Sequence, residues 1–247
     1  MIKKTIRLPL KGFRIENFQY ISMPGKLYSS QNMELYNRLF DFWKNQWHPV
    51  CASIKGIKNL SSDEFLRQKE VTAILFKEDI VGIMGVDHFC LKQKAHLHHS
   101  YFSYFPSQVL ENLLRVGINE VLILNQLAVD KPWRGIGISD LLVGLAVKKL
   151  SSGSVKKALS YTRNTHKTNQ LGYRWGGLPL MKNGKVHGEA ADFILFYENS
   201  YNNSQNHPLI LFVENLWLRK IDISEEINMN DRGKIESIQR EIELPHF

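Results

Sequence analysis

The chain has 247 residues, of which 43% are hydrophobic and 23% are charged. This composition excludes a disordered or fibrous chain and supplies enough apolar side chains for one large domain. The formal net charge of +8 gives a pI near 9.4, which favours anionic partners such as a nucleotide-like cofactor, an acidic carrier protein, anionic lipid or nucleic acid.

Neither a membrane span nor a secretory signal is expected. No apolar run approaches the roughly 18 residues that cross a bilayer. Residues 1–13 contain lysines but no sustained apolar stretch. Cys51 and Cys90 are too few for a disulfide framework. We therefore expect a cytoplasmic protein.

The first third of the chain predicts two helices and a hairpin. Residues 30–48 place apolar side chains at helical spacing. Ser61 precedes Glu64 by three residues, a capping-box pattern that predicts the start of a short helix. Residues 71–89 then predict two strands joined by a turn at 77–79.

The middle of the chain alternates helices and strands. A less regular segment follows the hairpin, and the elements expected after it are a helix at 107–116 that ends at Gly117, a strand at 120–129, a helix at 137–150, a strand at 155–162, a short helix or turn at 164–175, and strands at 178–186 and 191–198. Asn183-Gly184 is a turn signal between these last strands. The order predicts an α/β or α+β fold with a mixed sheet.

The composition changes near residue 200. Residues 198–208 are polar and predict a linker, so we expect a domain at 1–200 and an extension at 201–247. Within the extension, residues 209–221 are apolar and predict a helix that packs on the domain or on a second subunit. A helix lying on a membrane surface is the alternative, since Trp217, Arg219 and Lys220 would suit the boundary.

The turn between the strand at 120–129 and the next helix has the features of an anion site. Arg134, Gly135, Gly137 and Ser139 occupy this turn. The first amides of a helix have no intrahelical acceptors, and glycines remove the Cβ atoms that would hold an anion away. The turn therefore suits a phosphate or pyrophosphate.

Two common phosphate loops do not fit this turn. A P-loop needs a Lys-Ser or Lys-Thr pair after its glycines, and none follows here. A dinucleotide-binding fingerprint needs a third glycine where the sequence has Asp140.

The stretch "LAVDKPWRGIGISDLL" resembles the acyl-CoA-binding motif of the GNAT superfamily, the Gcn5-related N-acetyltransferases. The resemblance implies a mixed, mostly antiparallel sheet of about six or seven strands flanked by helices. It implies that the loop amides hold the pyrophosphate of coenzyme A, and that the strand before them splays from its neighbour and pairs with the pantetheine arm. The residues that the resemblance places at coenzyme A are Leu127, Ala128, Val129, Arg134, Gly135, Ile136, Gly137, Ile138, Ser139 and Asn164.

The resemblance leaves the catalytic groups open. Family members place a proton-donating Tyr seven residues after an Asn, and from Asn164 that position is Leu171. Tyr173 is then either the acid, in a shifted register, or a packing residue. Many relatives have a basic Glu where this chain has Gln126, and Glu120 lies at the start of the same strand. A water chain or an amine that arrives neutral could replace the base.

The histidines and the segment around them allow several interpretations. His88, His96, His98 and His99 lie near Cys90, but without an HxxxH or CxxC pair we expect no metal. They could instead form a polar wall near the acceptor or be ordinary histidines. The long segment 89–116 is similar to extra material in acyl-homoserine-lactone and N-acyl amino acid synthases, which take acyl chains from acyl carrier protein.

We therefore expect an N-acyltransferase that moves an acyl group, with acetyl as the first expectation, from acyl-CoA to a primary amine of a small molecule or peptide. One alternative is a synthase that depends on acyl carrier protein and makes N-acyl amino acids or acyl-homoserine lactones. Another is a non-catalytic module that binds coenzyme A thioesters. A homodimer is left open, and no nucleic acid is expected because no binding motif occurs.

Overall fold

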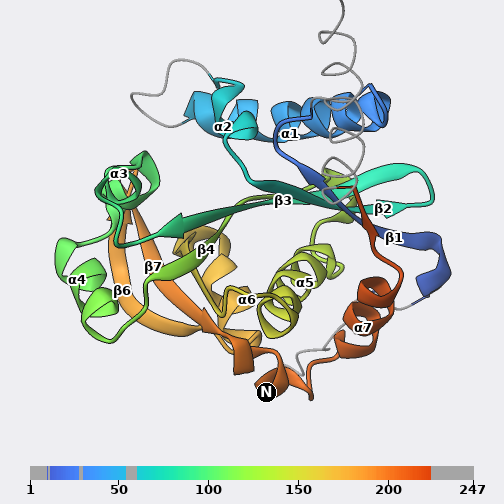
Figure 1. Cartoon of the computed structure of the whole chain (residues 1–247). Helices are drawn as coiled ribbons and strands as arrows, with labels where there is room; N and C mark the ends of the chain where they lie inside the picture. The colour runs from blue at the N-terminus through green and yellow to red at the C-terminus, as the bar shows by residue number, and fades with distance from the viewer. Residues whose placement is uncertain (1–9, 11, 28–29, 54–59, 224–247) are drawn as a thin grey trace, which may run out of the picture.

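The computed structural model describes residues 10, 12–27, 30–53 and 60–223. Its centre is one mixed sheet of eight strands in the order β6-β7-β5-β4-β3-β2-β1-β8 (Figure 1). The strands are β1 (Phe18–Pro24), β2 (Glu70–Phe76), β3 (Asp79–Cys90), β4 (Glu120–Val129), β5 (Lys157–Arg163), β6 (Leu178–Val186), β7 (Glu189–Tyr197) and β8 (Ile221–Asp222).

Helices cover both faces of this sheet. Helices α1 and α2 lie on one face, α5 and α7 lie on the other, and α3 and α4 lie beside β6 and β7 (Figure 1). The helices are α1 (Met33–Ser53), α2 (Asp63–Leu66), α3 (Lys94–Leu97), α4 (Ser107–Arg115), α5 (Ile138–Ser152), α6 (Thr168–Arg174) and α7 (Ile210–Leu218). The expected mixed, mostly antiparallel sheet is confirmed. The two strands nearest the chain ends, β1 and β8, were not predicted.

The pairing of the strands leaves a gap in the middle of the sheet. Most neighbours are antiparallel, and the hairpin of β2 and β3 turns where the sequence predicts. Strands β4 and β5 run parallel but pair only at Leu122 with Ala158 and at Ile123 with Leu159. Since β4 continues to Val129 and β5 to Arg163, the two strands separate beyond these pairs.

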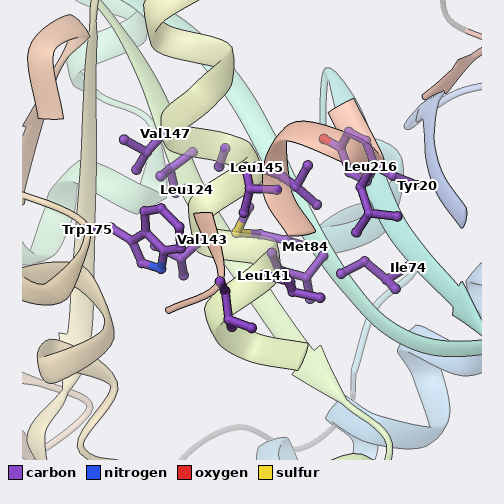
Figure 2. Close-up of a cluster of buried hydrophobic side chains, with 14 of the residues drawn as sticks. Tyr20, Ile74, Met84, Leu124, Leu141, Val143, Leu145, Val147, Trp175 and Leu216 are labelled. Carbon is purple, nitrogen blue, oxygen red and sulfur yellow. The ribbon is translucent and has the colours of Figure 1, made fainter. Parts of the chain in front are cut away.

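Helix α5 is the central helix of the core. It is apolar on nearly every side, which is the pattern of a helix buried all round. Figure 2 shows Leu141, Val143, Leu145 and Val147 of this helix among side chains from β1 to β4 and α7. Gly144 permits this packing, because a Cβ atom there would lie 2.5 Å from the ring of Trp175.

Two local predictions are wrong. The Ser61 hydroxyl accepts a hydrogen bond from the Asp63 amide, but Glu64 pairs with Arg67, so no capping box forms. The last hairpin turns at residues 187–188, where both residues have positive φ. Asn183 has a φ of 55° and lies at a register irregularity inside β6 instead of at the turn.

The polar segment after residue 197 is not a loose linker. It forms short 3₁₀ turns that bury Tyr201, Ser204 and His207 beside α5. Helix α7 then packs on α5 and β1, and β8 joins the sheet next to β1. The charged part of the expected extension, residues 224–247, lies outside the described residues.

Both cysteines are free thiols in the described part of the chain. Among the described residues, no helix is long and apolar enough to cross a membrane.

Candidate active site

The turn before α5 presents backbone amides to an open groove. Gly135 and Gly137 have φ values of 78° and 112°, which glycine adopts without strain. No side chain caps the N-terminus of α5, so the first amides of the helix are free of an intrahelical or capping partner. A Cβ atom on Gly135 would meet nothing within 4 Å, which shows that this side of the turn is open.

The groove has a volume of about 1250 Å³ and brings together most of the residues predicted to bind coenzyme A. The predicted residues that line it are Leu127, Ala128, Val129, Arg134, Gly135, Ile136, Gly137 and Ser139. The side chain of Ile138 is buried in the core instead, so only its backbone belongs to the turn.

Cationic side chains surround the groove. The Arg134 guanidinium donates to the Val129 carbonyl at 2.9 Å and to Gln46 Oε1 at 2.9 Å, which fixes it across the turn. Arg174 donates two hydrogen bonds of 2.9 and 2.8 Å to the carboxylate of Asp140, in the first turn of α5. Burial alone would raise the pKa of Asp140, but contacts with His207 and Arg174 outweigh it and lower the pKa.

A bulge in β4 shapes the inner end of the groove. Gln126 has a φ of 53°, and the register with β3 shifts at this point. Two indoles of α1 hold the bulge: Trp43 donates to Gln126 Oε1 at 3.0 Å, and Trp47 donates to the Gln126 carbonyl at 3.3 Å. The side-chain amide of Gln126 donates a hydrogen bond to Glu64 Oε2 at 3.4 Å, which connects the bulge to α2.

A second cavity of about 420 Å³ adjoins the groove between β4 and β5. The two share six lining residues, which are Trp47, Leu127, Arg163, His166, Thr168 and Leu171. We call this shared region the junction. The separation of β4 from β5 therefore connects the groove with the cavity.

One part of the cavity is polar and aromatic. Glu64 lines it and is the one carboxylate among the described lining residues, with Arg67 as its ion-pair partner. The ring of Tyr101 stacks on Tyr161 with centroids 4.7 Å apart. Burial raises the pKa of Tyr161 to about 12, so its hydroxyl stays protonated at neutral pH. This part can therefore receive a polar acceptor molecule.

Tyr173 and Asn164 are both hydrogen-bonded to Asp192. Tyr173 donates to Asp192 Oδ2 at 2.6 Å, and Asn164 donates to Asp192 Oδ1 at 3.0 Å. Asn169 Nδ2 and the Asn183 amide donate to the same carboxylate at 2.9 and 2.8 Å. We call these five residues the Asp192 cluster. Neither Tyr173 nor Asn164 lines the groove or the cavity, so this geometry does not support their predicted roles.

The hydrogen bonds of the Asp192 cluster shift the pKa values of Asp192 and Tyr173 in opposite directions. Burial by itself would raise the pKa of Asp192, but the bonds from Tyr173 and its neighbours lower it to about 2. Burial and this hydrogen bond both raise the pKa of Tyr173. A phenol that already donates to a carboxylate is poorly placed to give its proton to a leaving thiolate.

Sequence reasoning missed Glu64 and His166. The spacing from Ser61 suggested that Glu64 caps α2, whereas its side chain lines the cavity. His166 is an exposed residue at the junction. Leu171 also lies at the junction. It is the seventh residue after Asn164, where family members have the tyrosine, so the spacing in the sequence did point to this position.

The other candidate groups lie away from the cavity. Glu120 is at the far end of β4, where His88 lies 3.7 Å from its carboxylate. His96 and His99 accept hydrogen bonds from nearby backbone amides. The segment after them contributes Ser100, Tyr101, Ser103 and Tyr104 to the cavity wall instead. Among the described residues, no group of three or more His, Cys, Asp or Glu is placed to hold a metal ion.

Comparison with known proteins shows the fold. No family model matches the sequence, and a search of curated proteins finds no match. A polyamine N-acetyltransferase of Drosophila melanogaster is similar in structure, with a TM-score of 0.54, 12% identity, and coverage of 73% of this chain and 99% of that chain. An agmatine N-acetyltransferase has a TM-score of 0.50, 12% identity, and coverage of 72% and 100%.

A third similar structure is BjaI, a CoA-dependent acyl-homoserine lactone synthase. Its TM-score is 0.50 at 9% identity, and the match covers 83% of this chain and 93% of that chain. At these identities the likeness is one of fold. The chain therefore has the fold of the GNAT acyl-CoA N-acyltransferases, as the resemblance of its turn implied.

Proposed function

We propose that this protein is an acyltransferase that moves an acyl group from an acyl-CoA to a primary amine. The observation that carries the proposal is that the groove at the open amides before α5 adjoins the cavity between β4 and β5, because the two share the lining residues of the junction. One end suits an anionic, elongated donor, and the other end suits an acceptor.

The groove fits coenzyme A in charge and shape. Its uncapped helix amides and its arginines suit the pyrophosphate. The open side of Gly135 leaves room for phosphate oxygens close to the backbone. Residues 127 and 128 of β4 lie beyond the last β4–β5 pair, so the side of their backbone that faces β5 has no strand partner and is available to the pantetheine arm and to the thioester carbonyl.

The chemistry follows from the groups around the junction. The amine nitrogen attacks the thioester carbon, the C–S bond breaks, and the sulfur leaves as a thiolate that takes up a proton. A backbone amide of β4 stabilises the oxyanion without reorganising during the reaction. Glu64 removes one proton of the incoming ammonium before the attack, and the second proton that the nitrogen loses after the attack passes through His166, at the junction, to the thiolate sulfur.

Two similar structures support an amine acceptor. The polyamine N-acetyltransferase forms N-acetylagmatine, and the second similar structure is an agmatine N-acetyltransferase. Among the described residues that line the cavity, however, Arg67 and Arg163 lie with one carboxylate, that of Glu64. This balance disfavours a polyamine and favours an acceptor that has one amine and an anionic or neutral remainder.

A matched pair of glycine variants tests the donor site. Coenzyme A should raise the melting temperature of the wild type, because a ligand that binds the native state stabilises it. The variant Gly135→Glu should lose this shift, since its carboxylate would enter the groove. Gly117→Glu is the control: Gly117 has a φ of 81°, a Cβ atom there also meets nothing within 4 Å, and it follows α4, away from the groove.

Three outcomes separate the candidates. Release of free thiol from acyl-CoA that depends on an added amine supports the proposed enzyme. A shift with coenzyme A but no turnover on any amine would favour a non-catalytic binding module. No shift with coenzyme A, or an equal loss in both glycine variants, would overturn the donor site.

A further inference from the structure

The cavity extends to both faces of the sheet. Its polar part lies on the side of α1 and α2, where Glu64 and Tyr104 line it. Its other part is formed by core residues on the side of α5. We call this part the apolar end, and its lining residues are Met84, Leu124, Val143, Leu171, Gly172 and Phe196.

The gap between β4 and β5 is what connects the two parts. The last pair joins Ile123 with Leu159. Beyond it, the Ser160 hydroxyl donates to the Leu124 carbonyl at 2.9 Å, which is the one hydrogen bond between the two strands there among the described residues. Beyond this point, residues 125–127 and 161–163 line the same cavity from opposite sides. The sheet is therefore open where a thioester at the junction would lie.

The walls of the apolar end decide what can occupy it. Figure 2 shows Met84, Leu124 and Val143, from β3, β4 and α5, in one hydrophobic cluster. These side chains offer no hydrogen-bonding group that could replace water around an ammonium or carboxylate, so a charged acceptor is excluded from this end. An alkyl chain gains free energy there by leaving water.

An acetyl group would leave most of this space empty. The whole cavity measures about 420 Å³, which is within the range of roughly 300–1,000 Å³ for pockets that hold drug-sized ligands. Of the residues that line the apolar end, Leu171 is the one that also lines the junction, so a two-carbon group held at the junction would contact this end there. The volume therefore needs a longer acyl chain to fill it.

We infer that the apolar end holds the alkyl chain of the donor, so that the preferred substrate is an acyl-CoA with a chain longer than acetyl. This inference rests on the proposed function and names the donor class for the same site. The polar part of the cavity is then left to the amine acceptor. Leu171 fits this arrangement, because an apolar side chain at the junction lies beside the first carbons of the chain.

A series of donors tests the inference through binding alone. The dissociation constants of coenzyme A, acetyl-CoA, butyryl-CoA, hexanoyl-CoA and octanoyl-CoA are measured by calorimetry on the full chain. Affinity should rise roughly fourfold for each methylene that enters the apolar end. The same order is expected in the rate of thiol release once an amine is accepted. Equal affinities across the series would overturn the inference.

Variants of Val143 test where the chain lies. Val143→Phe fills the apolar end and should shift the preferred donor toward acetyl-CoA by at least tenfold in the ratio of hexanoyl-CoA to acetyl-CoA affinity. Val143→Ala enlarges the end and should shift the preference toward octanoyl-CoA. Because each readout is a ratio within one variant, a partly unfolded preparation does not imitate either result.

The control lies one turn further along the same helix. Val147 is fully buried in the same cluster (Figure 2). It is not among the residues that line the cavity. Val147→Ala should lose comparable stability and keep the wild-type chain-length order. A change of order in Val147→Ala as large as in Val143→Ala would overturn the assignment.

The two proposals fail in different ways. If coenzyme A itself does not bind, the proposed function fails together with this inference. If coenzyme A and acetyl-CoA bind but longer chains bind no better, the proposed function stands and the apolar end is not an acyl site.

Discussion

Two carboxylates near the cavity show how differently the same functional group can be used. Asp192 is only 3% exposed and accepts hydrogen bonds from four donors of its cluster. Glu64 is partly exposed to the cavity, and its contacts there are Arg67 and the amide of Gln126. Asp192 has no free acceptor site for a ligand, whereas Glu64 faces space that a ligand can enter.

The turn before α5 and the Asp192 cluster differ in the same way. The turn before α5 has open amides and an uncapped helix end, while the Asp192 carboxylate accepts hydrogen bonds from four donors of its own cluster. An abundance of polar residues therefore does not locate a site. Unsatisfied groups that face a cavity do, because satisfied groups gain nothing from a ligand.

The largest effect is expected at Glu64. Glu64→Gln keeps the size of the side chain but cannot accept a proton, so kcat/KM should fall by about a hundredfold or more, as expected for loss of a general base. Raising the pH should narrow the gap to the wild type, because more of the amine then arrives neutral. Initial rates of thiol release over a range of pH would measure this.

Glu120→Gln is the matched control for this prediction. Glu120 is an exposed carboxylate at the far end of β4, beside His88. Its loss should leave kcat/KM near the wild-type value. If Glu64→Gln and Glu120→Gln have the same kcat/KM at every pH, Glu64 does not act on the amine. Glu64 and Asp192 would then not differ in catalytic role.

Asp192→Asn should reduce stability more than it reduces binding. With a native pKa of about 2 against an ordinary value of 3.8, the ionised carboxylate contributes about 2 kcal/mol to the free energy of unfolding. Because the native pKa is depressed, this contribution is present above about pH 4 and is lost as the pH falls toward 2. Urea unfolding of both proteins between pH 2.5 and 7 would reveal it.

The outcome expected for binding sharpens the comparison. Asp192→Asn should bind coenzyme A with the affinity of the wild type, since no member of the Asp192 cluster lines the groove. The difference in unfolding free energy between the two proteins should shrink at the acidic end of the range. A difference that is constant with pH, or a large loss of coenzyme A affinity, would contradict the structural role.

Local sequence patterns predicted the groove because its chemistry is local. Residues 134–139 form the turn and the first residues of α5, and the open amides follow from two glycines and a helix start. The strands and helices of the middle of the chain were equally visible, since apolar periodicity lies within each element. Strand β4 occupies the predicted residues 120–129.

The rest of the site depends on contacts between distant segments. The hydrogen bond between Gln126 and Glu64 joins residues that are 62 positions apart in the sequence. The hydrogen bond from Tyr173 to Asp192 joins α6 to β7. Spacing alone therefore gave Glu64 a capping role and left Tyr173 between two registers. The bulge at Gln126 was also invisible, because the two indoles that hold it come from α1.

Tyr173→Phe is the smallest change and the most direct test of the predicted acid. It removes one of four hydrogen bonds to Asp192, so the free energy of unfolding should fall by about 1 kcal/mol. The ring still packs beside α5, and the turnover rate should stay within about twofold of the wild type, because the hydroxyl reaches neither cavity. If turnover instead drops about a hundredfold while the affinity for coenzyme A is unchanged, Tyr173 is restored as the proton donor. That result would mean that the Asp192 cluster rearranges when the donor binds. Tyr173 would then belong to the catalytic site as well as to the Asp192 cluster.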